Sequence, residues 1–200
     1  MQNIFIIHGS YGSSQGNWFP WMKKELSKLG HRVFVPQFPI PPVDKQDSTY
    51  DGHKLEEWIK TLKEYEKYIN KETVFIAHSR GCSFTFQSLP NLRIKINGLF
   101  LVAPFVDYDQ WKPDIYSEYD SFQAKPYLWK RIRQLTSHIE IFQSTNDEIP
   151  VEEGKFIAKK LEAKINIIKN AGHFNFASNK KFKEFPLLLK AIKKFLNNSN

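Results

Sequence analysis

The sequence has a single cysteine and no long apolar run. Cys82 has no second cysteine with which to form an internal disulfide, so nothing in the sequence requires an oxidising compartment. No stretch approaches the roughly 20 apolar residues that cross a bilayer, and the first apolar run, residues 3–7, is too short for a signal peptide. We therefore expect a soluble cytoplasmic protein with no membrane partner.

Motifs for common cofactors are also missing. The segment 8–14 has neither the G-x-G-x-x-G spacing of a dinucleotide-binding loop nor the lysine of a phosphate-binding P-loop. The sequence also lacks a cluster of cysteines, histidines or carboxylates with the spacing typical of metal ligands. We therefore expect neither a cofactor nor a metal ion.

Negative charge is scarcer than positive charge, with 21 acidic residues against 29 lysines and arginines and a net charge of +8. A basic stripe interleaved with aromatic residues would indicate a nucleic-acid groove. The lysines instead alternate with apolar residues at helical spacing, as at Lys23, Lys24 and Lys28. This pattern is typical of solvated helix faces, so we expect no nucleic-acid partner.

What the 200 residues do contain is a regular alternation of apolar runs and helix-period segments. Six runs are apolar nearly throughout, as in strands buried on both faces: 3–7, 32–35, 73–77, 98–102, 138–142 and 165–168. The alternation predicts one α/β domain with a mostly parallel six-stranded sheet, in the order 2-1-3-4-5-6, and helices on both faces.

Three apolar stripes at helical spacing predict helices between and after these strands. They consist of Trp18, Met22, Leu26 and Leu29; of Leu55, Trp58, Ile59, Leu62 and Ile69; and of Phe185, Leu188, Leu189, Ile192 and Leu196. Pro186 fits the last helix only in its first turn. The connection over residues 106–137 has no strand-like run and many aromatic and acidic residues, so we expect a lid-like insertion there.

Ser79 directly follows the third apolar run, so it would lie at the carboxyl ends of the strands, where parallel α/β proteins bind their ligands. Small residues two positions before it (Ala77) and two after it (Gly81) match the sharp strand-to-helix turn known as the nucleophile elbow, G-x-S-x-G, with alanine in place of the first glycine. A serine that only caps the following helix would give the same short motif.

A serine nucleophile needs a base, and in this fold the acid and then the histidine follow the serine in the chain. Only His138 and His173 come after Ser79. His138 opens a strand, so it would lie at the amino ends of the strands, away from Ser79. His173 follows the last strand, beside a glycine, and is the expected general base. Asp147 follows the fifth strand and is the expected acid. Glu148, Asp107 and Asp109 remain as alternative acids.

The oxyanion of an acyl-transfer reaction also needs two N–H donors. One is expected from the backbone of Arg80, the residue after the nucleophile. The other is expected from the loop after the first strand, from Ser10 or, as second choice, Tyr11. The Arg80 side chain is expected either to pair with an acid of the 106–137 segment or to attract a carboxylate on the substrate.

Five motifs together resemble the small serine hydrolases related to retinoblastoma-binding protein nine and their bacterial homologues. They are Phe5-Ile6-Ile7-His8-Gly9 with Asn17-Trp18-Phe19-Pro20-Trp21, Pro36-Gln37-Phe38-Pro39, Ala77-His78-Ser79-x-Gly81-Cys82, Asp147-x-x-Pro150 and Gly172-His173-Phe174. The resemblance spans nearly the whole chain. It implies an α/β-hydrolase fold, a Ser79–Asp147–His173 triad and carboxylesterase-like activity, without naming a substrate. Arg80 departs from the family, in which a neutral residue usually follows the nucleophile.

The sequence therefore predicts a serine hydrolase that cleaves a small ester, thioester or amide through an acyl-enzyme on Ser79. The alternative is a protein-interaction module that retains the hydrolase fold. A third reading, an enzyme that depends on Cys82, is disfavoured because this residue lies inside the predicted helix, where buried cysteine commonly serves packing.

Overall fold

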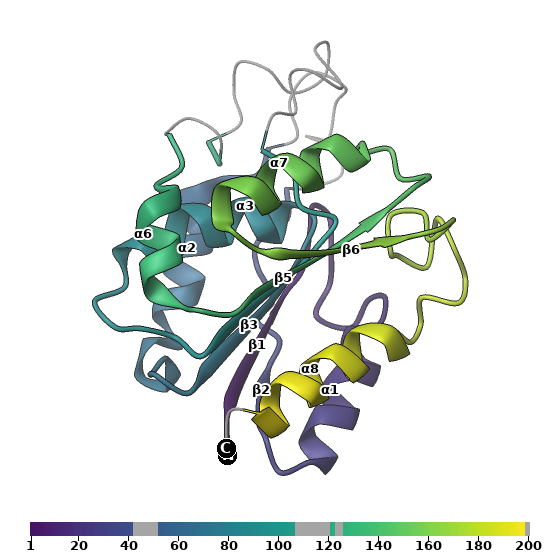
Figure 1. Cartoon of the computed structure of the whole chain (residues 1–200). Helices are drawn as coiled ribbons and strands as arrows, with labels where there is room; N and C mark the ends of the chain where they lie inside the picture. Colours follow the sequence, from purple (N-terminus) through teal and green to yellow (C-terminus); the bar gives the residue numbers. More distant parts are fainter. Residues whose placement is uncertain (42–51, 107–120, 123–125, 199–200) are drawn as a thin grey trace.

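Six strands form one parallel sheet in the computed structural model, which describes residues 1–41, 52–106, 121–122 and 126–198 (Figure 1). They are β1 (Asn3–Ile7), β2 (Arg32–Phe34), β3 (Thr73–His78), β4 (Gly98–Val102), β5 (Ile139–Ser144) and β6 (Lys164–Ile168). The order is β2-β1-β3-β4-β5-β6 and every neighbouring pair is parallel, which confirms the predicted sheet.

Helices cover both faces of the sheet, as predicted. The helices are α1 (Phe19–Lys28), α2 (Leu55–Lys63), α3 (Arg80–Ser88), α6 (Trp129–Leu135), α7 (Val151–Leu161) and α8 (Pro186–Asn198), with two 3-10 turns, η2 (Glu66–Tyr68) and η3 (Leu89–Asn91). Helices α1 and α8 lie side by side on one face, and α2, α3, α6 and α7 cover the other (Figure 1).

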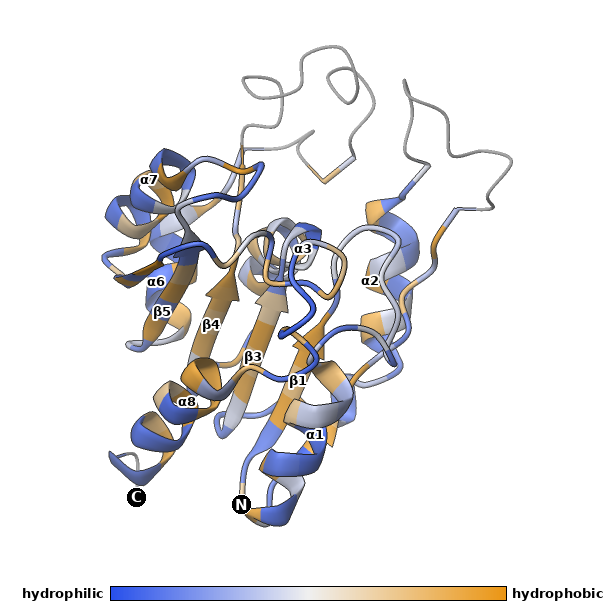
Figure 2. Cartoon of the chain, turned by 90° about the vertical axis from the view of Figure 1, so that its right-hand side faces the viewer, coloured by the Kyte–Doolittle hydropathy of each residue, from blue (hydrophilic) through white to orange (hydrophobic). Residues whose placement is uncertain are grey.

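Alternate residues of each central strand enter two separate cores because successive side chains point to opposite faces. Ile4 and Ile6 of β1 pack with α1 and α8, whereas Phe5 and Ile7 pack with α2 and α3. Figure 2 shows β1, β3 and β4 as hydrophobic almost throughout, while α1 and α8 carry hydrophilic residues as well. The continuous apolar runs in the sequence follow from this double burial.

The two edge strands differ from the prediction that all six strands are buried on both faces. In β2 only Val33 is buried, and β6 departs further. Its residues are partly or fully exposed, and Ile167 is 45% exposed, because β6 has a neighbour on one side only. β5 also begins and ends later than the predicted 138–142. Gln143 and Ser144 extend β5 although both are polar.

The helical stripes are found close to their predicted places. Leu29 follows the end of α1 and is 47% exposed, and Ile69 lies beyond α2, after the turn η2. Pro186 is the first residue of α8, as predicted. No helix of the described chain is both long and apolar enough to cross a bilayer.

Part of the segment 106–137 belongs to the helical layer of the fold. Ile132 and Leu135 of α6 are buried in the core between the sheet and its covering helices. Residues 107–120 and 123–125, which include the acidic residues expected in a lid, lie outside the described chain. Their role as a lid stays a prediction.

Candidate active site

Ser79 lies at the sharp turn between β3 and α3, with φ 56° and ψ −127°. This is a strained conformation for a residue other than glycine, and such strain is concentrated at functional sites. Its side chain makes no helix-capping hydrogen bond, so the capping alternative does not apply. The Ser79 N–H donates to the carbonyl of Val102, 2.9 Å away, which fixes the turn on the neighbouring strand.

Two glycines allow the turn to lie against the end of β1. A Cβ on Gly81 would lie 2.7 Å from the carbonyl oxygens of both Ile7 and His8. A Cβ on Gly9 would lie 2.8 Å from Cβ and 3.2 Å from Oγ of Ser79. These distances are too short for any side chain, so the first loop contacts the turn at Ser79 only because both positions are glycine.

His173 lies beside Ser79 although 94 positions separate them in the chain, with its Nε2 2.9 Å from Oγ of Ser79. This distance confirms the predicted proximity of serine and histidine. The loop that holds His173 contains Asn170, Gly172 and Phe174, each with a positive φ between 50° and 60°. Gly172, the glycine noted in the sequence beside His173, is therefore one of three residues in this loop with a left-handed backbone conformation.

The carboxylate of Asp147 accepts a hydrogen bond from the other ring nitrogen of His173, with Oδ1 2.9 Å from Nδ1. The Asp147 side chain is fully buried, and Oδ1 also accepts from the N–H of Ile149 at 3.1 Å. Glu148 is exposed. Asp107 and Asp109 lie outside the described residues. The structure thus brings Ser79, His173 and Asp147 into one hydrogen-bonded chain.

The loops after β5 and β6 are joined by side-chain hydrogen bonds to backbone N–H groups. Oδ1 of Asn146 accepts from Gly172 N–H at 2.7 Å, and Oγ of Ser144 accepts from Ala171 N–H at 3.0 Å. Because the first loop contains Asp147 and the second His173, these bonds set the distance between the two side chains.

His78 and Trp18 hold the consecutive backbone carbonyls of His173 and Phe174, a role that sequence reasoning missed. Nε2–H of His78 donates to the carbonyl of His173 at 2.8 Å, and Nε1–H of Trp18 donates to the carbonyl of Phe174 at 3.0 Å. Burial, with the nearby His173 as a smaller cause, lowers the pKa of His78 to about 3. His78 is therefore a neutral donor, and its place directly before the serine was the only available signal.

The loop after β1 contains both candidates for the second donor, Ser10 and Tyr11. The Tyr11 N–H donates to Nε2 of His53 at 3.2 Å. Among the described residues, the Ser10 N–H has no acceptor. Of the two candidate donors in this loop, only Ser10 therefore has an N–H available to a substrate oxygen.

Arg80, the other proposed donor, begins α3 with its side chain buried rather than extended into solvent. Its Nε–H donates to Oγ of Ser10 at 2.7 Å, and its guanidinium carbon lies 5.0 Å from the ring centre of Phe122. The acids expected to pair with it are in the segment 107–120, outside the described residues. The contact with Ser10 was not predicted.

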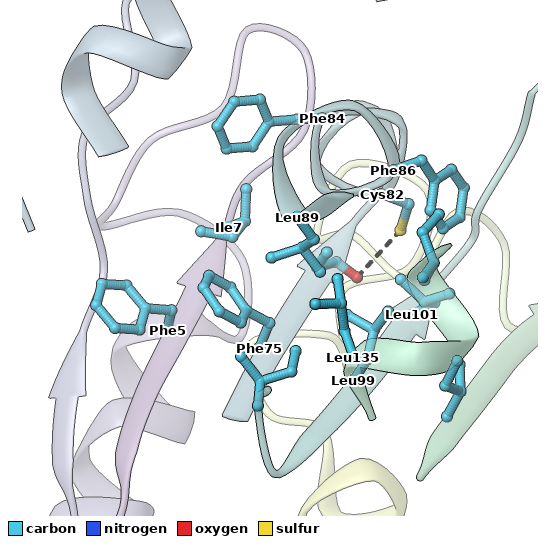
Figure 3. Close-up of a cluster of buried hydrophobic side chains, with 14 of the residues drawn as sticks. Phe5, Ile7, Phe75, Cys82, Phe84, Phe86, Leu89, Leu99, Leu101 and Leu135 are labelled. Carbon is cyan, nitrogen blue, oxygen red and sulfur yellow. Dashed lines mark hydrogen bonds between the residues drawn. The ribbon is translucent and has the colours of Figure 1, made fainter. Parts of the chain in front are cut away.

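Cys82 is fully buried in α3, among Phe86, Leu89 and Leu101 (Figure 3). Its thiol donates to the carbonyl of Ala77 at 3.3 Å, and burial raises its pKa. A protonated thiol in an apolar core is not a nucleophile, which argues against a cysteine-dependent enzyme. The described residues include no group of three or more histidine, cysteine or carboxylate side chains suited to a metal.

His138 lies at the opposite end of the sheet, as predicted from its place before the fifth strand. Its ring stacks on Phe195, with ring centres 4.1 Å apart, and its Nε2 lies 3.6 Å from the carboxylate of Glu140. His173 is therefore the histidine that reaches Ser79.

Sequence comparison finds hydrolases among the proteins similar to this chain. YdeN of Bacillus subtilis, which is named as a hydrolase, is 28% identical over 176 residues and 86% of each chain. The serine hydrolase RBBP9 of Rattus norvegicus is 25% identical over 96% of this chain and 94% of its own.

Solved structures give the same fold. The crystal structure of the ydeN product from B. subtilis matches 98% of this chain and 100% of that chain, with a TM-score of 0.82 and 25% identity. Est1E from Butyrivibrio proteoclasticus matches 99% of this chain and 89% of its own with a TM-score of 0.72, and at 17% identity it is similar in fold alone. The serine hydrolase family model matches residues 4–194, and the chain therefore belongs to the serine hydrolase family.

Proposed function

We propose that this hydrolase is a carboxylesterase that cleaves small esters, or related thioesters and amides, through an acyl-enzyme on Ser79. His173 is the general base, Asp147 orients it, and the backbone N–H groups of Ser10 and Arg80 form the oxyanion hole. The reaction needs water as the second substrate and draws on no metal or cofactor.

The observation that supports this proposal most is the 2.9 Å contact between His173 Nε2 and Ser79 Oγ. With Asp147 accepting from Nδ1, the neutral imidazole carries its proton on Nδ1 and presents the lone pair of Nε2 to the serine hydroxyl. A serine hydroxyl is a weak nucleophile on its own, and this arrangement is what activates it.

The proposed reaction has two halves. Oγ of Ser79 attacks the ester carbonyl carbon while Nε2 of His173 takes the hydroxyl proton, and the oxyanion that forms accepts hydrogen bonds from the Ser10 and Arg80 N–H groups. The tetrahedral intermediate then expels the alcohol, which receives the proton from Nε2. Water then attacks the acyl-enzyme carbonyl as the same nitrogen takes its proton, and the second tetrahedral intermediate releases the acid as Nε2 returns that proton to Oγ of Ser79.

A protein-interaction module of the same fold would have no chemical use for these three groups in hydrogen-bonded order. The buried Asp147 carboxylate in particular loses solvation without a benefit to binding at a distant surface. We also propose a cytoplasmic location and a small-molecule substrate, without nucleic-acid or membrane partners.

The test is turnover of p-nitrophenyl esters of increasing acyl length by the wild-type chain and by Ser79→Ala. Ser14→Ala is the matched control, because Ser14 is a half-buried serine of the loop after β1 whose backbone N–H, rather than its side chain, donates to Gln37. We expect hydrolysis by the wild type and by Ser14→Ala, and none above background by folded Ser79→Ala. Absence of turnover across the panel by the wild type would favour the interaction module.

A further inference from the structure

We infer that the Arg80 side chain is a positioning residue for the oxyanion hole: it fixes Ser10, whose backbone N–H is the second proposed donor. This inference rests on the proposed function. Nε–H of Arg80 donates to Oγ of Ser10 at 2.7 Å, across 70 positions of sequence. The side chain of one proposed donor residue thus bonds directly to the other donor residue.

Ser10 needs such a bond because it lies in a loop, outside the ladder of the sheet. Its neighbours are each held by their own partners: the Gly9 carbonyl accepts from Nδ1–H of His8 at 2.8 Å, and the Tyr11 N–H donates to His53 at 3.2 Å. Tyr11 also has a φ of 50°, a conformation that residues other than glycine rarely adopt. Within the described chain, the contact with Arg80 is the hydrogen bond that holds Ser10 itself.

The Arg80 side chain is well placed to hold this loop because it is itself fixed. It is 1% exposed, and its guanidinium carbon lies 5.0 Å from the ring centre of Phe122. The carbonyl of Phe122 accepts from Nε2–H of Gln87 at 2.9 Å and from the hydroxyl of Tyr127 at 3.3 Å. The aromatic surface under the guanidinium is therefore attached to α3 and to the segment before α6.

The start of α3 also lies at a fixed distance from the first loop. The position of Gly81 against the carbonyls of Ile7 and His8 leaves no room between them. The 2.7 Å bond from Arg80 therefore ties Ser10 to a helix start that is itself packed against the end of β1. An oxyanion hole stabilises the transition state only when its donors are already in place, so a loop that drifts loses rate rather than substrate affinity.

Positioning of Ser10 is a role beyond the two expected from the sequence, an ion pair with an acid of segment 107–120 or recognition of a substrate carboxylate. The bond to Ser10 uses the Nε–H of the guanidinium. The positioning role also explains why Ser10 has a hydroxyl side chain although the proposed catalytic group is its backbone N–H.

The experiment is a double-mutant cycle with Ser10→Ala, Arg80→Met and the double variant, with Ser14→Ala as control in the same loop. Each protein is assayed with p-nitrophenyl acetate and with its thionoester, in which sulfur replaces the carbonyl oxygen. Sulfur accepts hydrogen bonds weakly, so the thionoester depends less on the oxyanion hole. Circular dichroism and thermal unfolding establish that each variant is folded.

We expect each single variant to lower kcat for the oxygen ester about 10- to 100-fold with little change in KM, since misplacement of catalytic groups acts on the chemical step. In both single variants we expect the ratio of oxygen-ester to thionoester turnover to fall. We expect the double variant to be no slower than the slower single variant. Ser14→Ala should match the wild type. Damage to the Ser79–His173 pair would lower both turnovers alike.

Effects of Ser10→Ala and Arg80→Met that simply multiply in the double variant would overturn the inference, because the two residues would then act independently. An unchanged kcat in Ser10→Ala would also overturn it, and this variant keeps Arg80 and changes only a loop side chain. Lack of esterase activity in the wild type would instead refute the proposed function, and the inference with it.

Discussion

Replacing His78 by glutamine removes a buried group that titrates differently in the folded and unfolded chain. Glutamine keeps an N–H donor near the position of Nε2, which donates to the His173 carbonyl at 2.8 Å. The pKa of His78 is lowered from its ordinary value of 6.5 to about 3 by burial in the folded protein. The unfolded chain therefore binds a proton at mildly acidic pH that the folded chain does not bind.

This difference in proton binding decides whether the free energy of unfolding rises or falls with pH. A group with a depressed pKa in the folded state contributes its full stabilisation above the unfolded pKa, and that contribution is lost as the pH falls from 6.5 toward 3. In this window the free energy of unfolding falls by about 1.4 kcal/mol for each pH unit when the unfolded chain binds one more proton. His78 alone therefore lowers it by about 2 kcal/mol between neutral pH and about pH 5. Most carboxylates are still ionised there, which isolates the histidine contribution.

The assay is urea unfolding of the wild type and of His78→Gln at about pH 7.5 and about pH 5, where the difference for one proton is about 2 kcal/mol. We expect the wild type to lose about 2 kcal/mol more unfolding free energy than the variant on this shift. The other histidines cancel because both proteins contain them. His138→Gln is the matched control: His138 is half-buried and Glu140 opposes the lowering of its pKa, so a smaller effect is expected. Equal pH dependence in His78→Gln and the wild type would refute the reasoning.

Three further substitutions test other parts of the site. Asp147→Asn should leave the circular dichroism spectrum unchanged and lower kcat for p-nitrophenyl esters by roughly 10³- to 10⁴-fold, because the amide favours the wrong tautomer of His173; a loss below tenfold would exclude Asp147 as the orienting acid. Gly81→Ala should lower the free energy of unfolding by about 1–3 kcal/mol in urea titrations, because its Cβ would lie 2.7 Å from two backbone oxygens, and an unchanged midpoint would contradict the close contact. Cys82→Ala should retain esterase activity, and iodoacetamide should leave the native thiol unmodified near neutral pH, because burial raises its pKa; inactivation by the reagent would return the cysteine to consideration.

The strand order and the site at the carboxyl edge were predictable because they depend on local pattern and chain order. Ile4, Phe5, Ile6 and Ile7 are all buried, and a short run of this kind is typical of a strand covered on both faces. The limits of β5 were predicted wrongly because Gln143 is polar and yet buried. Its amide donates to the carbonyl of Ile149 at 3.0 Å, a partner that the pattern of one strand cannot reveal.

Side chains whose roles depend on contacts between distant segments were not predictable. His78 acts on a residue 95 positions away, and the choice between Ser10 and Tyr11 depends on His53, 42 positions from Tyr11. Arg80 directly follows Ser79 in the sequence, but the direction of its side chain depends on Ser10 and Phe122. Spacing along the chain gives the side chains that follow each strand, and only the packed structure gives their partners.

The most direct test of the account is the site at which a fluorophosphonate labels the wild-type chain. The reagent reacts with a hydroxyl only where a base activates it and an oxyanion hole holds the phosphoryl oxygen, so labelling reports the assembled site rather than exposure. We predict one covalent adduct, located by mass spectrometry on Ser79, which is lost in folded Ser79→Ala and nearly lost in His173→Ala. An adduct on Ser10, Ser13, Ser14 or Ser83, or full esterase activity in folded Ser79→Ala, would show that Ser79 is not the nucleophile.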